Sequence, residues 1–204
     1  MTVSGPTATP RLPSNPFSTR FTRPGSIAPL DASGQPVDLV PLTDRLPGPG
    51  GCVAITGPHG HGKTSLLVAI LAEAGVRGRR TMLVRVGASS DAWRVLTVLA
   101  RTAPATVVGI DGWDRIASAC LPVLRLVAWC RGASLLVTTH RLDGLPILAR
   151  CETTLGLLTA IVARLPHHGG LIDATDLEDA FRRHGGNVRE ALYDLYDRFE
   201  RRIR

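Results

Sequence analysis

Residues 57–64 read Gly57-Pro58-His59-Gly60-His61-Gly62-Lys63-Thr64. A short apolar stretch, 52–56, precedes them, and an apolar segment from Lys63 to Ala74 follows and ends at Gly75. The octapeptide has the spacing G-x-x-x-x-G-K-[ST], a loop whose backbone N–H groups surround phosphate groups. The N-terminus of the following helix adds positive potential at the same point. The stretch therefore predicts a strand, a phosphate-binding loop and a helix in direct succession.

Lys63 is the only lysine among the 24 Lys and Arg residues of the chain. An ammonium group is a compact charge on a flexible stem, so it can reach between β- and γ-phosphates where a planar guanidinium fits badly. The hydroxyl of Thr64 is a hard oxygen ligand of the kind that Mg²⁺ prefers. His59 and His61 are expected to point to solvent rather than to bind a metal ion. The residues expected to contact a nucleotide are Gly57, Pro58, His59, Gly60, His61, Gly62, Lys63, Thr64 and Ser65.

The composition is that of one α/β domain, or of a core with a small appendage. The 204 residues are 44% hydrophobic, carry a net charge of +7 and have a pI near 10.2. This charge permits contact with DNA, but an arginine-rich solvated surface explains it equally well. Aromatic residues make up only 4%, which argues against a platform that stacks single-stranded bases.

The cysteines and the N-terminus predict a cytoplasmic protein with no membrane contact. The four cysteines form no C-x-x-C pair and lie in apolar stretches, which is typical of buried free thiols. The first residues do not follow the pattern of a signal peptide. The longest apolar stretch, 66–72, is too short to span a bilayer.

The chain divides into three regions by composition. Residues 1–50 hold ten of the fifteen prolines and predict an extended arm. Within the arm, 15–24 combines two aromatic residues with two arginines; it either packs across the core, reaches a partner, or is a leader without fixed structure. Residues 51–166 alternate between strand and helix patterns, which predicts a parallel sheet flanked by helices. Residues 167–204 are helical only and predict a small lid.

Several element boundaries follow from local signals. Ser90 is expected to cap a helix that runs to about Thr102, and Pro122 to mark a kink or first turn of a helix over 116–130. A short fifth strand is expected at 153–155. Further strands are expected at 81–86, 106–111 and 134–139. In the lid, a capping box at 175–178 opens one helix, which ends at 185–186, and Asn187 caps the last.

Asp111 is the second residue expected to hold the metal ion. Residues 107–111 form a small, apolar strand that places this carboxylate at its carboxyl end, beside the phosphate loop. Asp111 would bind Mg²⁺ together with Thr64. The next residue is Gly112, where many ATPases carry a catalytic glutamate. Asp114 is the nearest replacement, and it either polarises the attacking water or caps the helix that begins near Arg115.

The end of the strand at 134–139 carries a polar cluster. A hydroxyl or imidazole there can orient the water beside the γ-phosphate. Thr139 is the first candidate for this role and His140 the second; the alternative is a simple transition from strand to loop.

At this point the chain resembles the AAA+ superfamily of P-loop ATPases, with a core like that of clamp loaders and initiators and a short lid. Pro146-Ile147-Leu148-Ala149-Arg150-Cys151 resembles the Ser-Arg-Cys segment of clamp-loader subunits, with alanine for serine. Gly186-Asn187-Val188-Arg189-Glu190-Ala191-Leu192 resembles the sensor-2 helix of the superfamily.

The resemblance implies roles for two arginines. Arg150 becomes a candidate finger that reaches the γ-phosphate of a neighbouring subunit, and Arg189 a contact from the lid to the γ-phosphate. The alternatives are a surface cation at a helix end for Arg150 and an ion-pair partner within the lid for Arg189.

The leading hypothesis is an ATP-binding ATPase with Mg²⁺ that acts as a switch or loader on a protein or protein–DNA partner. It would associate with itself or with a partner through the side that carries Arg150. Hydrolysis is expected to be slow because of Gly112. The alternatives are a nucleotide-binding scaffold without hydrolysis and a small-molecule kinase.

Overall fold

The computed structural model describes residues 15–87, 91–116, 118–141, 144–166 and 170–204. Its centre is a parallel sheet of five strands in the order β2-β3-β4-β1-β5. The strands are β1 (Cys52–Thr56), β2 (Thr81–Arg85), β3 (Val107–Asp111), β4 (Ser134–Thr139) and β5 (Ile147–Arg150). All pairs are parallel, so the carboxyl ends of the strands meet at one edge. The predicted α/β class and flanked parallel sheet are confirmed.

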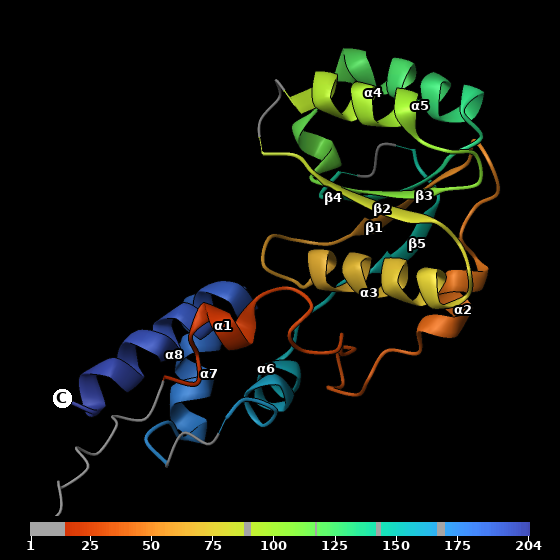
Figure 1. The fold of residues 1–204 in the computed structure, drawn as a ribbon. Helices are drawn as coiled ribbons and strands as arrows, with labels where there is room; N and C mark the ends of the chain where they lie inside the picture. Colours follow the sequence, from red (N-terminus) through yellow and green to blue (C-terminus); the bar gives the residue numbers. More distant parts are fainter. Residues whose placement is uncertain (1–14, 88–90, 117, 142–143, 167–169) are drawn as a thin grey trace, which may run out of the picture.

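Helices cover both faces of this sheet (Figure 1). One face carries α3 (Lys63–Val76) with α2 (Leu39–Asp44), and the other carries α4 (Ala92–Arg101) and α5 (Leu121–Cys130). Short 3₁₀ turns, η2 (Trp113–Arg115) and η3 (Ser118–Cys120), lead from β3 to α5. The central strands are buried on both faces, which explains why their sequences are mostly apolar, with Ser or Thr only at their ends.

The remaining helices form the lid beside this core (Figure 1). They are α6 (Leu155–Val162), α7 (Ala174–Arg183) and α8 (Val188–Arg202). One hydrophobic cluster includes residues of all three helices, so the packed unit begins at α6. The turn between α7 and α8 uses Gly185 and Gly186, both with positive φ, where the sequence predicted the helix to end.

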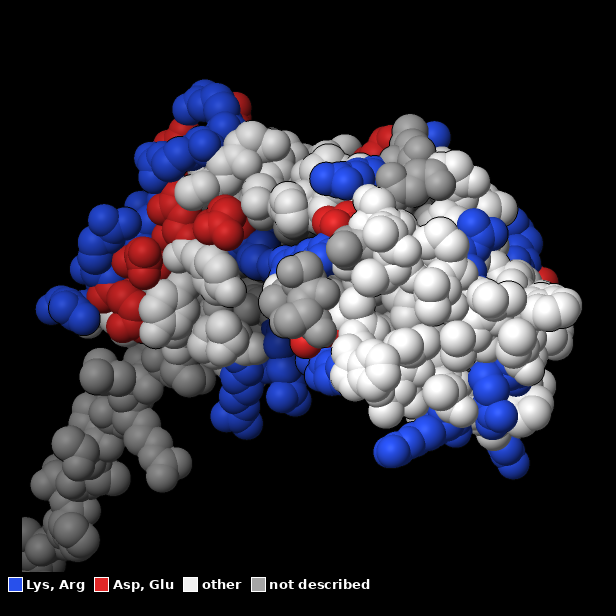
Figure 2. Space-filling view, turned by 90° about the horizontal axis from the view of Figure 1, so that it is seen from above, with Lys and Arg blue, Asp and Glu red and all other residues white. Residues whose placement is uncertain are grey.

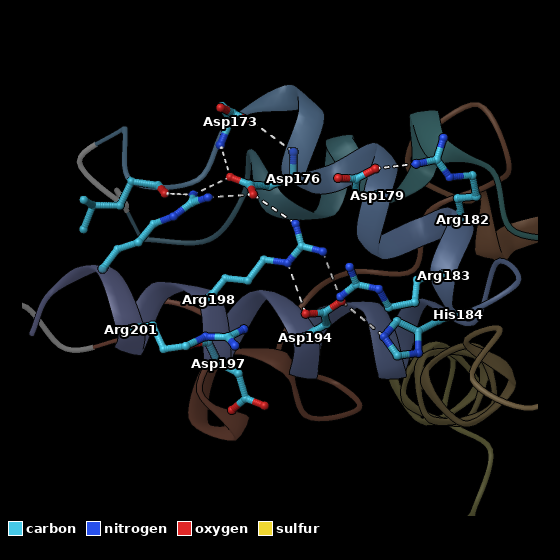
Figure 3. A network of polar contacts seen from close by, with 12 residues as sticks. Asp173, Asp176, Asp179, Arg182, Arg183, His184, Asp194, Asp197, Arg198 and Arg201 are labelled. Carbon is cyan, nitrogen blue, oxygen red and sulfur yellow. Dashed lines mark hydrogen bonds and ion pairs between the residues drawn. The ribbon is translucent and has the colours of Figure 1, made fainter.

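Ion pairs join α7 to α8 (Figure 3). Asp176 is 5% exposed and accepts a hydrogen bond from Arg198 at 3.0 Å, and Arg202 binds the same carboxylate. Arg198 also reaches Asp194 at 3.1 Å. These arginines hold the pKa of Asp176 well below its usual range, with the hydrogen bond from Arg202 as the largest cause.

The arm packs against the lid through the segment that begins at Asn15. The Asn15 Nδ2 donates to the carbonyl oxygen of Tyr196 at 3.0 Å and to Glu200 at 2.9 Å, both in α8. Phe17 is 1% exposed and meets Phe199 edge to face, with ring centroids 6.2 Å apart. The short helix α1 (Thr19–Thr22) follows. Asn15 and Phe17 of the predicted arm are therefore folded onto the last helix of the chain.

Two local predictions were wrong. The fifth strand lies at β5, and residue 155 instead begins α6. The capping box of α7 uses Asp173 and Asp176 rather than 175–178. Pro122 lies in the first turn of α5, which is one of its two predicted places, and the segment before this helix forms 3₁₀ turns. Asn187 caps α8 as predicted, and Ser90 lies outside the described residues.

Candidate nucleotide-binding site

The phosphate-binding loop lies at the carboxyl edge of the sheet, between β1 and α3. Its backbone depends on glycine at two positions. Gly57 has φ +150°, and a Cβ there would come within 2.5 Å of the Cys151 carbonyl oxygen. Gly60 has φ +76°, and a Cβ there would overlap the side-chain oxygen of Asn187 in the lid. The loop is therefore held between β5 and the start of α8.

The ammonium of Lys63 lies inside the loop. It donates to the carbonyl oxygens of Gly57 at 2.6 Å and Pro58 at 2.7 Å, and it lies 3.1 Å from Nδ1 of His140. Burial lowers the pKa of Lys63, while the charges of Asp114 and Asp111 oppose this effect.

Thr64 and Asp111 meet at the mouth of the loop, as the sequence predicts for a shared metal site. The Thr64 hydroxyl lies 3.0 Å from each carboxylate oxygen of Asp111. A hydroxyl beside a carboxylate is a set of hard oxygens that suits Mg²⁺. Ser65 lines the same cavity.

Sequence reasoning missed Thr138. Its hydroxyl donates to Oδ1 of Asp111 at 2.7 Å and accepts from the backbone N–H of Gly112 at 2.8 Å. Thr138 thus fixes the orientation of the carboxylate from the neighbouring strand. Adjacent residues of a strand point to opposite faces, but the sequence alone does not tell which of the two threonines faces Asp111.

The side chains of Thr139 and His140 have different hydrogen-bond partners. The Thr139 hydroxyl is buried and accepts from the N–H of Arg141 at 3.0 Å, so it is engaged within its own turn. His140 faces the loop, with Nδ1 2.9 Å from the Gly57 carbonyl oxygen. The centroid of its ring lies 3.6 Å from the centroid of the His59 ring. Burial, and then the charge of Lys63, lower the pKa of His140. The geometry favours His140, the second candidate, over Thr139.

The two loop histidines contact other side chains. His59 is exposed, as predicted, and its ring contacts that of His140 in a tilted arrangement. His61 is half-buried, with Nδ1 3.3 Å from the Thr153 hydroxyl. That hydroxyl also donates to the Gly186 carbonyl at 2.7 Å, which links the loop to the lid. The expectation of a solvent-facing side chain therefore holds for His59 and not for His61. No group of three or more metal-ligating side chains occurs within the described ranges.

Asp114, Arg150 and Arg189 all line the same cavity of about 730 Å³. Asp114 lies in η2, which begins after Gly112, so it does not cap a longer helix. Arg150 is exposed at the end of β5, beside Thr56, and is not at a helix end. Arg189 lies in the first turn of α8, and its charge contributes to the lowered pKa of Lys63. None of the ion pairs among the described residues includes Arg189.

Much of the remaining lining comes from the arm and the lid, where apolar side chains lie beside polar ones such as Arg23, Asp31 and Glu152. The arm contributes Ile27, Pro29 and Leu30, and the lid contributes Leu157 and Leu192. A flat apolar group bound here would be enclosed by segments that lie more than a hundred residues apart in the chain. The sequence pattern gave no signal for this part of the site.

Comparison with known proteins gives structural matches only. No protein-family profile matches the chain, and no curated protein matches it. Among solved structures, Thermotoga maritima RuvB, described as a Holliday junction branch migration motor, matches with a TM-score of 0.51 and 21% identity over 70% of this chain. Two point mutants of the same RuvB match with TM-scores of 0.52 and 0.53, at 20% and 21% identity, each over 76% of this chain.

The chain spans 52–56% of the length of these RuvB chains. Identity at this level speaks for a shared fold, and the fold places the phosphate loop, Asp111 and the helical lid in the order that the sequence resemblance implies. Within the part of the chain that is described, no helix is long and apolar enough to cross a membrane. The structural matches and the order of these elements together show that the chain has the fold of the AAA+ P-loop ATPases.

Proposed function

We propose that this chain binds ATP with Mg²⁺, hydrolyses it slowly, and acts as a nucleotide-driven switch on a partner. The observation that carries the proposal is the meeting of Thr64 and Asp111, 3.0 Å apart, beside the buried ammonium of Lys63. Lys63 and Thr64 at the start of α3, with Asp111 facing Thr64 from the end of β3, suit a nucleotide polyphosphate.

The residues present fit magnesium. Thr64 and Asp111 would hold the ion, and Thr138 would keep the carboxylate oriented. The ion would neutralise charge on the β- and γ-phosphates. Lys63 would exchange the carbonyls of Gly57 and Pro58 for phosphate oxygens.

Release of Lys63 also prepares His140. While the ammonium lies 3.1 Å from Nδ1, that nitrogen accepts a hydrogen bond from it and the other ring nitrogen carries the hydrogen. Once Lys63 turns to the phosphates, Nδ1–H can donate to the Gly57 carbonyl at 2.9 Å, leaving Nε2 as an acceptor. His140 would then orient the attacking water, with Asp114 as the nearest acid. Because Gly112 supplies no carboxylate, turnover is slow.

The lid supplies the switch. Asn187 lies against Gly60, and Thr153 bridges His61 and Gly186, so the loop and the lid share one contact surface. ATP would bring Arg189 toward the γ-phosphate and favour the closed lid, and loss of that phosphate would release it. Arg150 is exposed enough to serve a neighbouring chain, which makes self-association part of the proposal.

A nucleotide-binding scaffold without hydrolysis is the second candidate, because Gly112 lacks a carboxylate where an acid would activate water. DNA is a candidate partner, because the net charge is +7 and RuvB is described as a branch migration motor. A steep fall in DNA affinity with salt is expected if the arginines bind phosphates.

The first test measures binding of a fluorescent ATP analogue and ATPase rate together, over a range of protein concentration with light scattering. Wild type should bind the analogue more tightly with Mg²⁺ and hydrolyse ATP. Lys63→Ala should lose binding, while Arg101→Ala, at the far end of α4, should not. Binding without turnover at every concentration would favour the scaffold. Failure of wild type to bind any nucleotide at millimolar concentration would contradict both the ATPase switch and the nucleotide-binding scaffold.

A further inference from the structure

Helix α5 is apolar on almost every side. Leu124 and Ala128 are buried on the sheet. On the outer side, Val123, Leu126 and Trp129 are 50%, 57% and 67% exposed. A helix that is hydrophobic all round normally lies inside a protein rather than at its surface. Its single charged residue is Arg125.

The sheet lacks a covering helix next to α5. The connections from β1 to β2, β2 to β3 and β3 to β4 each contain a long helix. The connection from β4 to β5, residues 140–146, contains none among its described residues. Parallel strands are usually joined by a crossover of a dozen or more residues that forms a helix on the face of the sheet. Here α4 and α5 cover their face alone (Figure 1).

A groove of about 610 Å³ runs along this side of α5. One wall is formed by Leu121, Pro122, Arg125, Leu126 and Trp129. These positions fall on one side of a helix, so the groove follows α5 for most of its length of roughly 15 Å.

The rest of the groove comes from three separate segments. Gly50, Trp113 and Leu145 line it. Gly50 lies against the Trp129 indole, with no room for a Cβ. The groove is therefore built by the segment before β1, the turn after β3 and the loop between β4 and β5.

The charge of the groove is one-sided. No residue that lines it is acidic, and Arg125 is exposed without a hydrogen bond or ion pair to any other described residue. Seen from above, the layer of α4 and α5 is mostly uncharged with basic side chains around it (Figure 2). An apolar, aromatic centre beside arginine is the composition of a protein interface.

We propose that an amphipathic helix of a partner protein, apolar on one face and with a carboxylate at its edge, lies in this groove along α5. It would cover Leu126 and Trp129, pair with Arg125, and take the place of the crossover helix between β4 and β5. The mostly apolar lining and single arginine offer no row of cations for a phosphate backbone. A symmetric contact with a second copy through α5 would place Arg125 near its own equivalent, which is unfavourable.

The test selects binders from a displayed library of amphipathic helical peptides on the full-length chain, with counter-selection on Leu126→Glu. Trp93→Glu is the matched control, because Trp93 is 74% exposed on α4 and does not line the groove. Nucleotide binding and thermal unfolding of each variant report its folding. Enriched peptides should carry apolar residues at i, i+3, i+4 and i+7 with flanking Glu or Asp. They should bind Trp93→Glu like wild type and Leu126→Glu at least tenfold more weakly.

Tryptophan fluorescence then locates the peptide. In Trp93→Phe the remaining tryptophans, Trp113 and Trp129, both line the groove, so a Trp-free peptide bound there should shift the emission. Arg125→Glu should reverse the preference, favouring a lysine version of the peptide.

Four results would overturn the proposal. The first is that no peptide is enriched over the Leu126→Glu counter-selection, and the second is that the enriched peptides carry no Asp or Glu. The third is that short duplex DNA displaces the peptide. The fourth is that light scattering shows dimers of the wild-type chain that Leu126→Glu abolishes. The last would assign the groove to a second copy. None of these results bears on nucleotide binding, which is measured separately.

Discussion

The Thr138 hydroxyl lies 2.7 Å from Oδ1 of Asp111 and fixes the carboxylate expected to bind the metal ion. The same hydroxyl accepts the N–H of Gly112, so it also sets the turn that leaves β3. A residue on β4 thereby controls the geometry of a residue on β3.

Thr138→Val should weaken Mg²⁺-dependent nucleotide binding by about tenfold or more, since a hydrogen bond to a charged group contributes roughly 1.5–3 kcal/mol. Titration of a fluorescent ATP analogue at several Mg²⁺ concentrations measures this. Thr139→Val is the matched control, because its hydroxyl bonds only within its own turn. Equal losses in the two variants would contradict the role given to Thr138.

His140→Gln should lower the ATPase rate by about 10²-fold, the smaller end of the effect of a positioned acid–base group. The neutral imidazole is the active form, so wild-type kcat/KM should fall as pH drops through the pKa of His140. Because burial lowers this pKa below its ordinary value of 6.5, the fall should lie on the acid side of the usual histidine range. The His140→Gln variant should not show this decrease of kcat/KM at acid pH. An unchanged profile in His140→Gln would remove His140 from the reaction.

Arg150→Ala should reduce ATPase activity by at least tenfold while ATP affinity stays within a few-fold. If Arg150 acts on a neighbour, mixing this variant with Lys63→Ala should restore activity, because each chain supplies what the other lacks. Since Arg150 also lines the cavity of its own chain, absence of recovery in the mixture would assign it to that cavity. Light scattering on the same samples reports whether mixed oligomers form.

Asp176→Asn should destabilise the protein by about 2 kcal/mol, because Arg198 and Arg202 lose hydrogen bonds to a shared, buried carboxylate while Arg198 keeps its pair with Asp194. Asp179→Asn, in the same helix, should cost below about 0.5 kcal/mol, since its ion pair with Arg182 is exposed. Urea unfolding at pH 7 measures both.

The cost of Asp176→Asn should depend on pH with a defined sign. The pKa of Asp176 in the folded state lies below its ordinary value of 3.8, so the stabilisation is complete above about pH 4. It is lost as the pH falls below 3.8 toward the folded-state value. Wild type and variant should therefore converge in strong acid. A constant difference down to pH 2 would contradict the ion-pair account.

Local sequence signals predicted the core well, because the loop at 57–64, Asp111 and the Asn187 cap each depend on residues close together in the chain. Two alternatives with equal spacing misled the assignment of α7, since Asp173 with Asp176 and Thr175 with Glu178 both fit a capping box. The strand β5 was missed because it has only four residues and follows a proline.

Other parts of the site depend on contacts between distant segments. The choice between Thr138 and Thr139 requires the register of β4 on β3, and adjacent threonines carry no local sign of it. The docking of Asn15 and Phe17 on α8 joins residues about 180 positions apart, and no periodic pattern in the arm points to it.

This docking has a mechanical consequence. Asn15 is hydrogen-bonded to α8, and the chain then runs from Asn15 to Ile27, which lines the cavity. The two ends of the described chain are therefore joined beside the proposed nucleotide pocket. A displacement of α8 would act on the pocket through Arg189 and also through the arm. Cutting the chain after Phe21 would leave the fold of the sheet intact but remove this second connection.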